Sequence, residues 1–151
     1  MSTVDLSPYK LKFPIQIRFS DFDSLGHANN AAYLTYLEEA RIKYFSEVIT
    51  KSEVDWRQDG IILARMEIDF RKPITGYNDY FVYIRCSRIG NKSFDFSYVI
   101  TREQNGTIEI MAEAKSVMVC FDYKKNETIL MREDWRNKVK TFESSKGIAT
   151  G

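Results

Sequence analysis

Hydrophobic and polar residues alternate along much of the chain, and the period changes from two to about 3.6 residues near the N-terminus. The alternation over residues 13–20 predicts a half-buried β-strand. Its expected buried face consists of Phe13, Ile15, Ile17 and Phe19. A long helix should follow, because Asn29 or Asn30 can cap its N-terminus and apolar residues then recur every three or four positions up to Ile49.

Four more strands are predicted at residues 61–71, 80–88, 94–101 and 107–123. Turn-forming residues separate the last three, so we expect two successive hairpins and four strands in consecutive antiparallel order. Strands of this length exceed the usual size in globular proteins, so the sheet should bend strongly. A short amphipathic helix is predicted at residues 133–142, with Trp135 and Val139 on its apolar face.

One long helix and five long strands predict an α+β fold in which a curled antiparallel sheet wraps around the helix. We expect an N-terminal segment at residues 1–12, one domain at 13–142 and a flexible C-terminal tail at 143–151. The last strand is apolar on both faces at Val117, Val119 and Phe121. One curled sheet cannot easily bury both faces, so a partner chain is expected.

Composition narrows the function classes. The 151 residues include 22 basic and 21 acidic ones, so the net charge is close to zero and creates no overall electrostatic attraction to nucleic acid or an anionic membrane. We find no leader-like N-terminus and no apolar run of the roughly 18 residues that a membrane span needs, and therefore expect a cytoplasmic protein. Cys86 and Cys120 lie far apart in sequence, which indicates buried, reduced thiols.

The segment between the first strand and the long helix concentrates the polar chemistry. It contains Asp21, Asp23, Gly26, Asn29 and the only histidine, His27. A helix start offers free backbone N–H groups and a partial positive charge that favours a developing anion. The loop is therefore the candidate active site. The chain lacks the motifs of serine hydrolases, phosphate-binding loops, dinucleotide-binding folds and zinc proteases.

One family shares this pattern. The residues that carry the likeness are Arg18-x-x-Asp21-x-Asp23-x-x-Gly26-His27-x-Asn29-Asn30-x-x-Tyr33-Leu34-x-Tyr36-x-Glu38-x-x-Arg41. Together with the order of elements, they resemble the hotdog-fold acyl-CoA thioesterases of the 4-hydroxybenzoyl-CoA thioesterase type. Residues 70–74 and 90–94 resemble two turns of the same family, so the likeness covers most of the chain.

The resemblance implies roles for several residues. Asp23 matches the family's catalytic carboxylate, which either attacks the thioester carbonyl or activates water, and the backbone N–H at Asn30 would polarise the thioester oxygen. Arg88 and Lys92, around the turn at 89–91, would hold the nucleotide end of an acyl-CoA substrate. The family also implies a homodimer or homotetramer with the site between two chains, and no metal or organic cofactor.

Structural roles compete with these assignments. Aspartates often shape turns, and we favour that role for Asp21. Asn29 either caps the helix or orients Asp23 or a water molecule. His27 is a candidate catalytic residue by its position, since related plant acyl-ACP thioesterases have a functional histidine there, but the asparagine two residues before that histidine is replaced by Leu25 here. His27 therefore either orients the substrate or supports the loop.

Further candidates have equally plain alternatives. Tyr33 either contacts the substrate or belongs to the core, and Arg88 and Lys92 are either binding residues or surface charges of a hairpin. The function predicted is hydrolysis of an acyl-CoA thioester. The alternative is a module that binds acyl-CoA or an acyl-carrier protein without turnover, because a fold does not determine function. The sequence leaves open the acyl group, and whether attack is covalent or by water.

Overall fold

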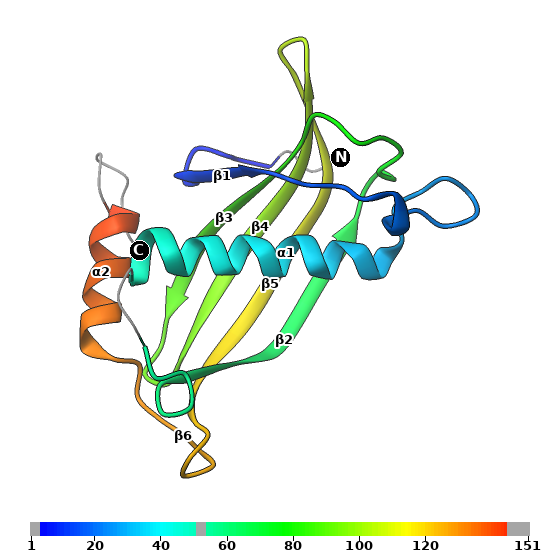
Figure 1. The fold of residues 1–151 in the computed structure, drawn as a ribbon. Helices are drawn as coiled ribbons and strands as arrows, with labels where there is room; N and C mark the ends of the chain where they lie inside the picture. Colours follow the sequence, from blue (N-terminus) through cyan, green and yellow to red (C-terminus); the bar gives the residue numbers. More distant parts are fainter. Residues whose placement is uncertain (1–3, 51–53, 145–151) are drawn as a thin grey trace.

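The computed structural model describes residues 4–50 and 54–144, and it has the predicted α+β hotdog arrangement (Figure 1). Its helices are α1 (Asn30–Tyr44) and α2 (Glu133–Ser144). Its strands are β1 (Leu11–Pro14), β2 (Gly60–Phe70), β3 (Tyr80–Ile89), β4 (Ser93–Gln104), β5 (Thr107–Asp122) and β6 (Glu127–Thr128). Figure 1 shows the long strands curving past α1, as their length predicted.

The sheet order is β1-β3-β4-β5-β2, with the short β6 also paired to β5 and all pairs antiparallel. The two hairpins β3–β4 and β4–β5 are therefore confirmed. The expectation that four strands follow one another in the sheet is wrong, because β2 pairs with β5 instead of β3. The connection between β2 and β3, residues 71–79, has nine residues and is longer than a hairpin turn. It can therefore pass β5 and β4 and reach the position of β3.

The first strand is shorter than its hydrophobic pattern. β1 ends at Pro14, which has no N–H to donate to a neighbouring strand. Ile15 and Ile17 remain buried, whereas Phe19 is 86% exposed in a 3₁₀ turn at Phe19–Asp21. The prediction that Phe19 lies on the buried face is therefore wrong, because the chain has already turned away from the sheet.

Helix α1 forms the centre of the core. Its buried face includes Tyr33, Tyr36, Leu37, Ala40 and Tyr44, at the spacing predicted from the sequence. The helix continues as a π-helical turn over Phe45–Ile49, so the apolar pattern up to Ile49 was interpreted correctly. No helix among the described residues is long and apolar enough to cross a lipid bilayer.

Helix α2 packs Trp135 and Val139 into the core, as predicted. It ends at Ser144, two residues inside the predicted flexible tail, because the Glu143 carboxylate is anchored. Glu143 Oε2 accepts hydrogen bonds from the Tyr44 hydroxyl (2.6 Å) and from the Cys86 N–H (2.8 Å). The remaining tail positions, 145–151, lie outside the described residues.

We predict that Glu143 makes the free energy of unfolding depend on pH. Burial raises the pKa of Glu143 above its ordinary value of 4.5, although both hydrogen bonds oppose the shift. The folded protein then holds this proton at pH values where the unfolded chain has lost it, so stability should fall as pH rises from about 4.5 through the raised folded pKa. Denaturant titrations of Glu143→Gln should show a weaker decline than wild type. An unchanged pH dependence, equal to that of the exposed control Glu133→Gln, would contradict the assignment.

Candidate active site

The candidate loop, residues 22–29, lies between the 3₁₀ turn and the start of α1, and backbone hydrogen bonds hold both of its ends. Phe22 and Ala28 form an isolated antiparallel bridge. The Asn29 N–H donates to the Asp21 carbonyl (2.7 Å), and the Ala28 N–H donates to the Ile74 carbonyl (2.8 Å). The loop is thus tied both to its own base and to the crossing connection at 71–79.

Asp23 uses one carboxylate oxygen to shape this loop. Its Oδ1 accepts hydrogen bonds from the N–H groups of Leu25 (2.9 Å) and His27 (3.2 Å), while its own N–H donates to the His27 carbonyl (2.9 Å). Gly26 completes the turn at φ +77°, a conformation that glycine adopts without strain. Asp23 Oδ2 has no hydrogen-bond partner among residues 4–50 and 54–144, and the residue is exposed. One oxygen is therefore structural, and the other is free for chemistry.

Asp21 acts as an anchor, in agreement with the structural role we favoured. Its Oδ2 accepts hydrogen bonds from the Arg18 N–H (2.9 Å) and from the Tyr36 hydroxyl (2.7 Å). Burial and the neighbouring Asp21 carboxylate both raise the pKa of Tyr36, so this hydroxyl stays protonated and keeps donating. The contact fastens the loop to the middle of α1.

The start of α1 supplies the backbone donors. Asn29 is the helix N-cap, as predicted, because its side-chain oxygen accepts from the Ala31 N–H (2.8 Å) and its carbonyl accepts from the Ala32 N–H (2.8 Å). The Asn30 N–H has no acceptor within the part of the chain that the structure describes. It is an unused donor at the positive end of the helix.

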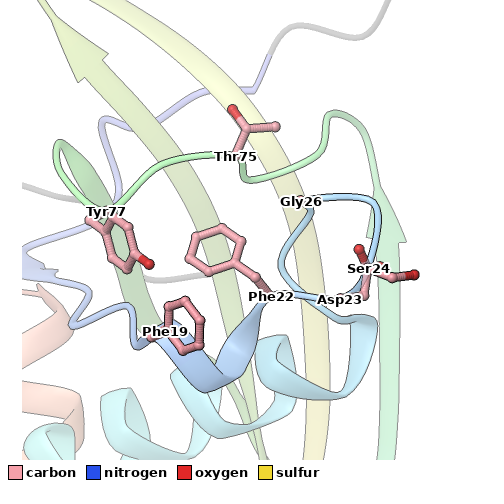
Figure 2. Close-up of a pocket in the computed structure, with 7 residues that line it drawn as sticks. All are labelled: Phe19, Phe22, Asp23, Ser24, Gly26, Thr75 and Tyr77. Carbon is pink, nitrogen blue, oxygen red and sulfur yellow. The ribbon is translucent and has the colours of Figure 1, made fainter.

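A cavity of about 400 Å³ opens beside the loop (Figure 2). Its lining consists of Phe19, Phe22, Asp23, Ser24, Gly26, Thr75 and Tyr77. Figure 2 shows the rings of Phe19, Phe22 and Tyr77 gathered on one side and Asp23 and Ser24 on the other. Phe22 and Tyr77 make an edge-to-face contact with ring centroids 5.0 Å apart. The cavity thus combines an apolar wall with one carboxylate.

Sequence reasoning missed most of this wall. Phe19 was assigned to a strand face, and Tyr77 was interpreted only as part of a turn signal. Thr75 and Tyr77 lie about fifty residues from the loop in sequence, and only the crossing connection brings them there. The predicted order, in which four strands follow one another in the sheet, did not indicate that this segment reaches the loop.

Two other predicted residues lie near the loop but outside the cavity lining. Tyr33 is 2% exposed, and its ring packs edge-to-face against Phe70 at 4.9 Å, so it belongs to the core. His27 is half-buried, and its backbone N–H and carbonyl both bond to Asp23. These bonds make the His27 backbone part of the loop scaffold, while a catalytic role for its imidazole stays a prediction.

Arg88 and Lys92 lie far from the loop within one chain. Thr75 of the cavity contacts Tyr80 at the start of β3, whereas Arg88 comes eight residues later, about 26 Å along the strand. The Arg88 guanidinium binds both oxygens of the buried Asp95 carboxylate at 3.0 Å. Lys92 is exposed, with its Nζ 3.5 Å from the Thr128 hydroxyl oxygen. The structure therefore does not bring these cations to Asp23 of the same chain.

Metal ligation and thiol chemistry find no support in the described residues. No group of three or more His, Cys, Asp or Glu side chains in residues 4–50 and 54–144 is arranged to hold a metal ion. Cys86 and Cys120 are buried and unpaired, as predicted. Burial raises the pKa of Cys86 to about 12 and that of Cys120 to about 11, so both remain protonated thiols near neutral pH.

Comparison with known proteins agrees with the fold. The sequence profile of the thioesterase-like superfamily matches residues 17–139. The chain is 26% identical over 125 residues to the long-chain acyl-CoA thioesterase FadM of Escherichia coli (strain K12), covering 83% of this chain and 93% of that protein. It is also 31% identical over 85 residues to the uncharacterized protein YsmA of Bacillus subtilis (strain 168), which covers 56% of each chain.

Solved structures give the same result. The crystal structure of a thioesterase from Thermus thermophilus, complexed with coenzyme A and Zn, matches with a TM-score of 0.76 and 31% identity. The match covers 91% of this chain and 96% of that one. The probable thioesterase YbaW of Escherichia coli matches with a TM-score of 0.70 and 26% identity, covering 85% of this chain and 98% of that one.

Proposed function

The chain belongs to the thioesterase-like superfamily, and from that premise we propose that it hydrolyses an acyl-CoA thioester to a carboxylic acid and free CoA. The observation that carries the proposal is the free Oδ2 of Asp23 in the lining of a cavity with an apolar wall, on a loop that leads into a helix start whose Asn30 N–H is unused. A carboxylate and a preorganised donor are the two groups that attack on a thioester carbonyl requires. The similarity to FadM supports CoA thioesters as the substrate class.

The proposed chemistry follows the 4-hydroxybenzoyl-CoA type. The thioester oxygen accepts a hydrogen bond from the Asn30 N–H, where the helix start favours the negative charge that develops on that oxygen. Asp23 Oδ2 then either adds to the carbonyl carbon or takes a proton from the water that adds to it. The carbon–sulfur bond breaks and the CoA thiolate leaves. In the first route, water then hydrolyses the mixed anhydride formed with Asp23, which releases the carboxylic acid and restores the Asp23 carboxylate. In both routes the thiolate takes up the proton that the water gives up and becomes the free thiol. No step requires a metal ion or an organic cofactor.

The proposed active form is a dimer joined through β2. This strand lies at the end of the sheet, so one long edge of unpaired backbone groups is open to a second copy. A two-fold axis would pair β2 antiparallel with its copy and reverse the second sheet. Arg88 and Lys92 of the second chain would then approach the Asp23 loop of the first. This arrangement explains how cations remote from the loop in one chain could serve the same site, and two such dimers could form a tetramer.

The first test is turnover itself. We expect the purified protein to release a free thiol from at least one member of an acyl-CoA panel that spans aromatic, short-chain and long-chain acyl groups. A thiol-reactive dye measures the release. Saturable binding of acyl-CoA without thiol release would overturn the proposal and identify a non-catalytic binding module. The domain boundaries, 13–142, and a cytoplasmic location remain predictions.

A further inference from the structure

Two tyrosines on the buried face of α1 donate their hydroxyl groups to carboxylates at different places along the helix. Tyr36 is 2% exposed and donates to Asp21 Oδ2 (2.7 Å). Tyr44 is 0% exposed and donates to Glu143 Oε2 (2.6 Å). Tyr44 comes eight residues after Tyr36, about 12 Å farther along the helix. The same contact therefore occurs once at the base of the candidate loop and once away from it.

Asp21 connects Tyr36 to the two groups that are proposed to react. Its carboxylate accepts from the Tyr36 hydroxyl, and its backbone carbonyl accepts from the Asn29 N–H (2.7 Å). The residue after Asn29 is Asn30, which carries the unused N–H, and Asp23 follows two residues after Asp21. One residue therefore fixes both the point where the loop begins and the point where it enters the helix.

Tyr36 supplies the buried side-chain bond that ties the start of the loop to the body of α1. Without it, the Asp21 carboxylate keeps one hydrogen-bond partner among residues 4–50 and 54–144, the Arg18 N–H (2.9 Å). That bond spans three residues, so it shapes the turn without fixing the turn on the helix. A largely exposed ion pair between Arg18 and Glu39 (3.4 Å) also reaches α1, but such pairs contribute little.

We propose that Tyr36 is a positioning residue for thioester hydrolysis, because its bond to Asp21 fixes Asp23 relative to the Asn30 N–H. This inference rests on the proposed function and adds a residue that does not line the cavity. The carboxylate and the N–H donor must meet one carbonyl group, and an error of about 1 Å can cost about 100-fold in rate. Loss of the Tyr36 hydroxyl should therefore lower kcat at least about 10-fold and change KM little.

The first test compares Tyr36→Phe with the matched control Tyr44→Phe. Both changes delete one buried hydroxyl of α1 together with its bond to a carboxylate, so both should lower the free energy of unfolding. Only Tyr36→Phe should lower kcat. Denaturant titrations, and steady-state kinetics at a temperature where both variants are folded, measure these effects. Equal kcat values for the two variants, or a change in KM alone for Tyr36→Phe, would overturn the proposal.

Variants of Asp21 check that Tyr36 acts through this residue. Asp21→Asn keeps an oxygen that can accept from the Tyr36 hydroxyl, so its kcat should fall less than that of Tyr36→Phe. Asp21→Ala removes the acceptor, and in that background Tyr36→Phe should have no further effect on kcat. A further loss as large as in the wild-type background would mean that Tyr36 acts independently of Asp21, and would overturn the proposal.

The last measurement needs no substrate. Exchange of the Asn29 backbone N–H with deuterated solvent reports how often its bond to the Asp21 carbonyl opens. Tyr36→Phe should speed this exchange at least about 10-fold, and Tyr44→Phe should leave it unchanged. A wild-type protein that turns over no acyl-CoA would overturn the proposed function, whereas unchanged Asn29 exchange in Tyr36→Phe would by itself overturn the positioning role.

Discussion

Replacement of Asp23 by asparagine should lower kcat by at least about 100-fold while the protein stays folded. The structure makes this variant a sharp test, because Asp23 Oδ1 shapes the loop by accepting from two N–H groups and an asparagine side-chain oxygen can accept both. The substitution therefore removes the charge at Oδ2 and keeps the turn. Steady-state kinetics with the best acyl-CoA of the panel, together with circular dichroism, measure the two outcomes.

Two neighbouring substitutions serve as controls for this result. Asp21→Asn weakens an anchor that accepts from the Arg18 N–H and the Tyr36 hydroxyl, so it should reduce stability more than it reduces kcat. His27→Ala should cost less activity than Asp23→Asn, because the observed bonds of His27 to Asp23 are made by its backbone. Turnover of Asp23→Asn near the wild-type rate would reject Asp23 as nucleophile or base.

Local pattern explains most of the fold that could be predicted. The core face of α1 and the hairpins β3–β4 and β4–β5 follow from residue spacing and turn residues, which act over short distances. The position of β2 did not follow, because the connection at 71–79 contains turn signals whichever strand it leads to. The early end of β1 had a local signal in Pro14, which the alternation up to Phe19 concealed, and the bond from the Arg18 N–H to Asp21 then turns the chain away from the sheet.

The candidate site also contains parts that local sequence predicts and parts that depend on contacts between distant segments. The placement of Asp23, Asn29 and Asn30 on one loop and helix start was predictable because these residues are contiguous in sequence, whereas their catalytic roles stay predictions from the family resemblance. The aromatic wall was not, since Tyr77 reaches the loop from a distant segment. The burial of Arg41 was not predictable either. A charge beside the apolar stripe of a helix usually faces water, and its burial depends on the start of β2 lying next to α1.

Lys92 is expected to affect the binding of CoA more than the chemical step. Lys92→Glu removes a cation and adds a like charge near the proposed position of the CoA phosphates, so kcat/KM should fall at least about 10-fold, mainly through a raised KM. An acyl-pantetheine substrate without the nucleotide should lose little. Lys138→Glu, on the exposed side of α2, is the matched control. Arg88 is a poorer probe, because its removal would strip the 3% exposed Asp95 carboxylate of its bidentate partner.

Mixing two impaired variants tests whether the site is shared between chains. In a dimer of Asp23→Asn with Lys92→Glu, the intact Asp23 would be served by the intact Lys92 of the other chain, and that site would be complete. A large excess of the Asp23→Asn chain, allowed to exchange subunits, should therefore restore each Lys92→Glu chain to about wild-type activity, a gain of at least about 10-fold. If both residues served a site within one chain, neither chain could repair the other. Activity that stays at the sum of the two separate variants, with co-purification through an affinity tag on one variant showing that mixed dimers have formed, would reject the shared site.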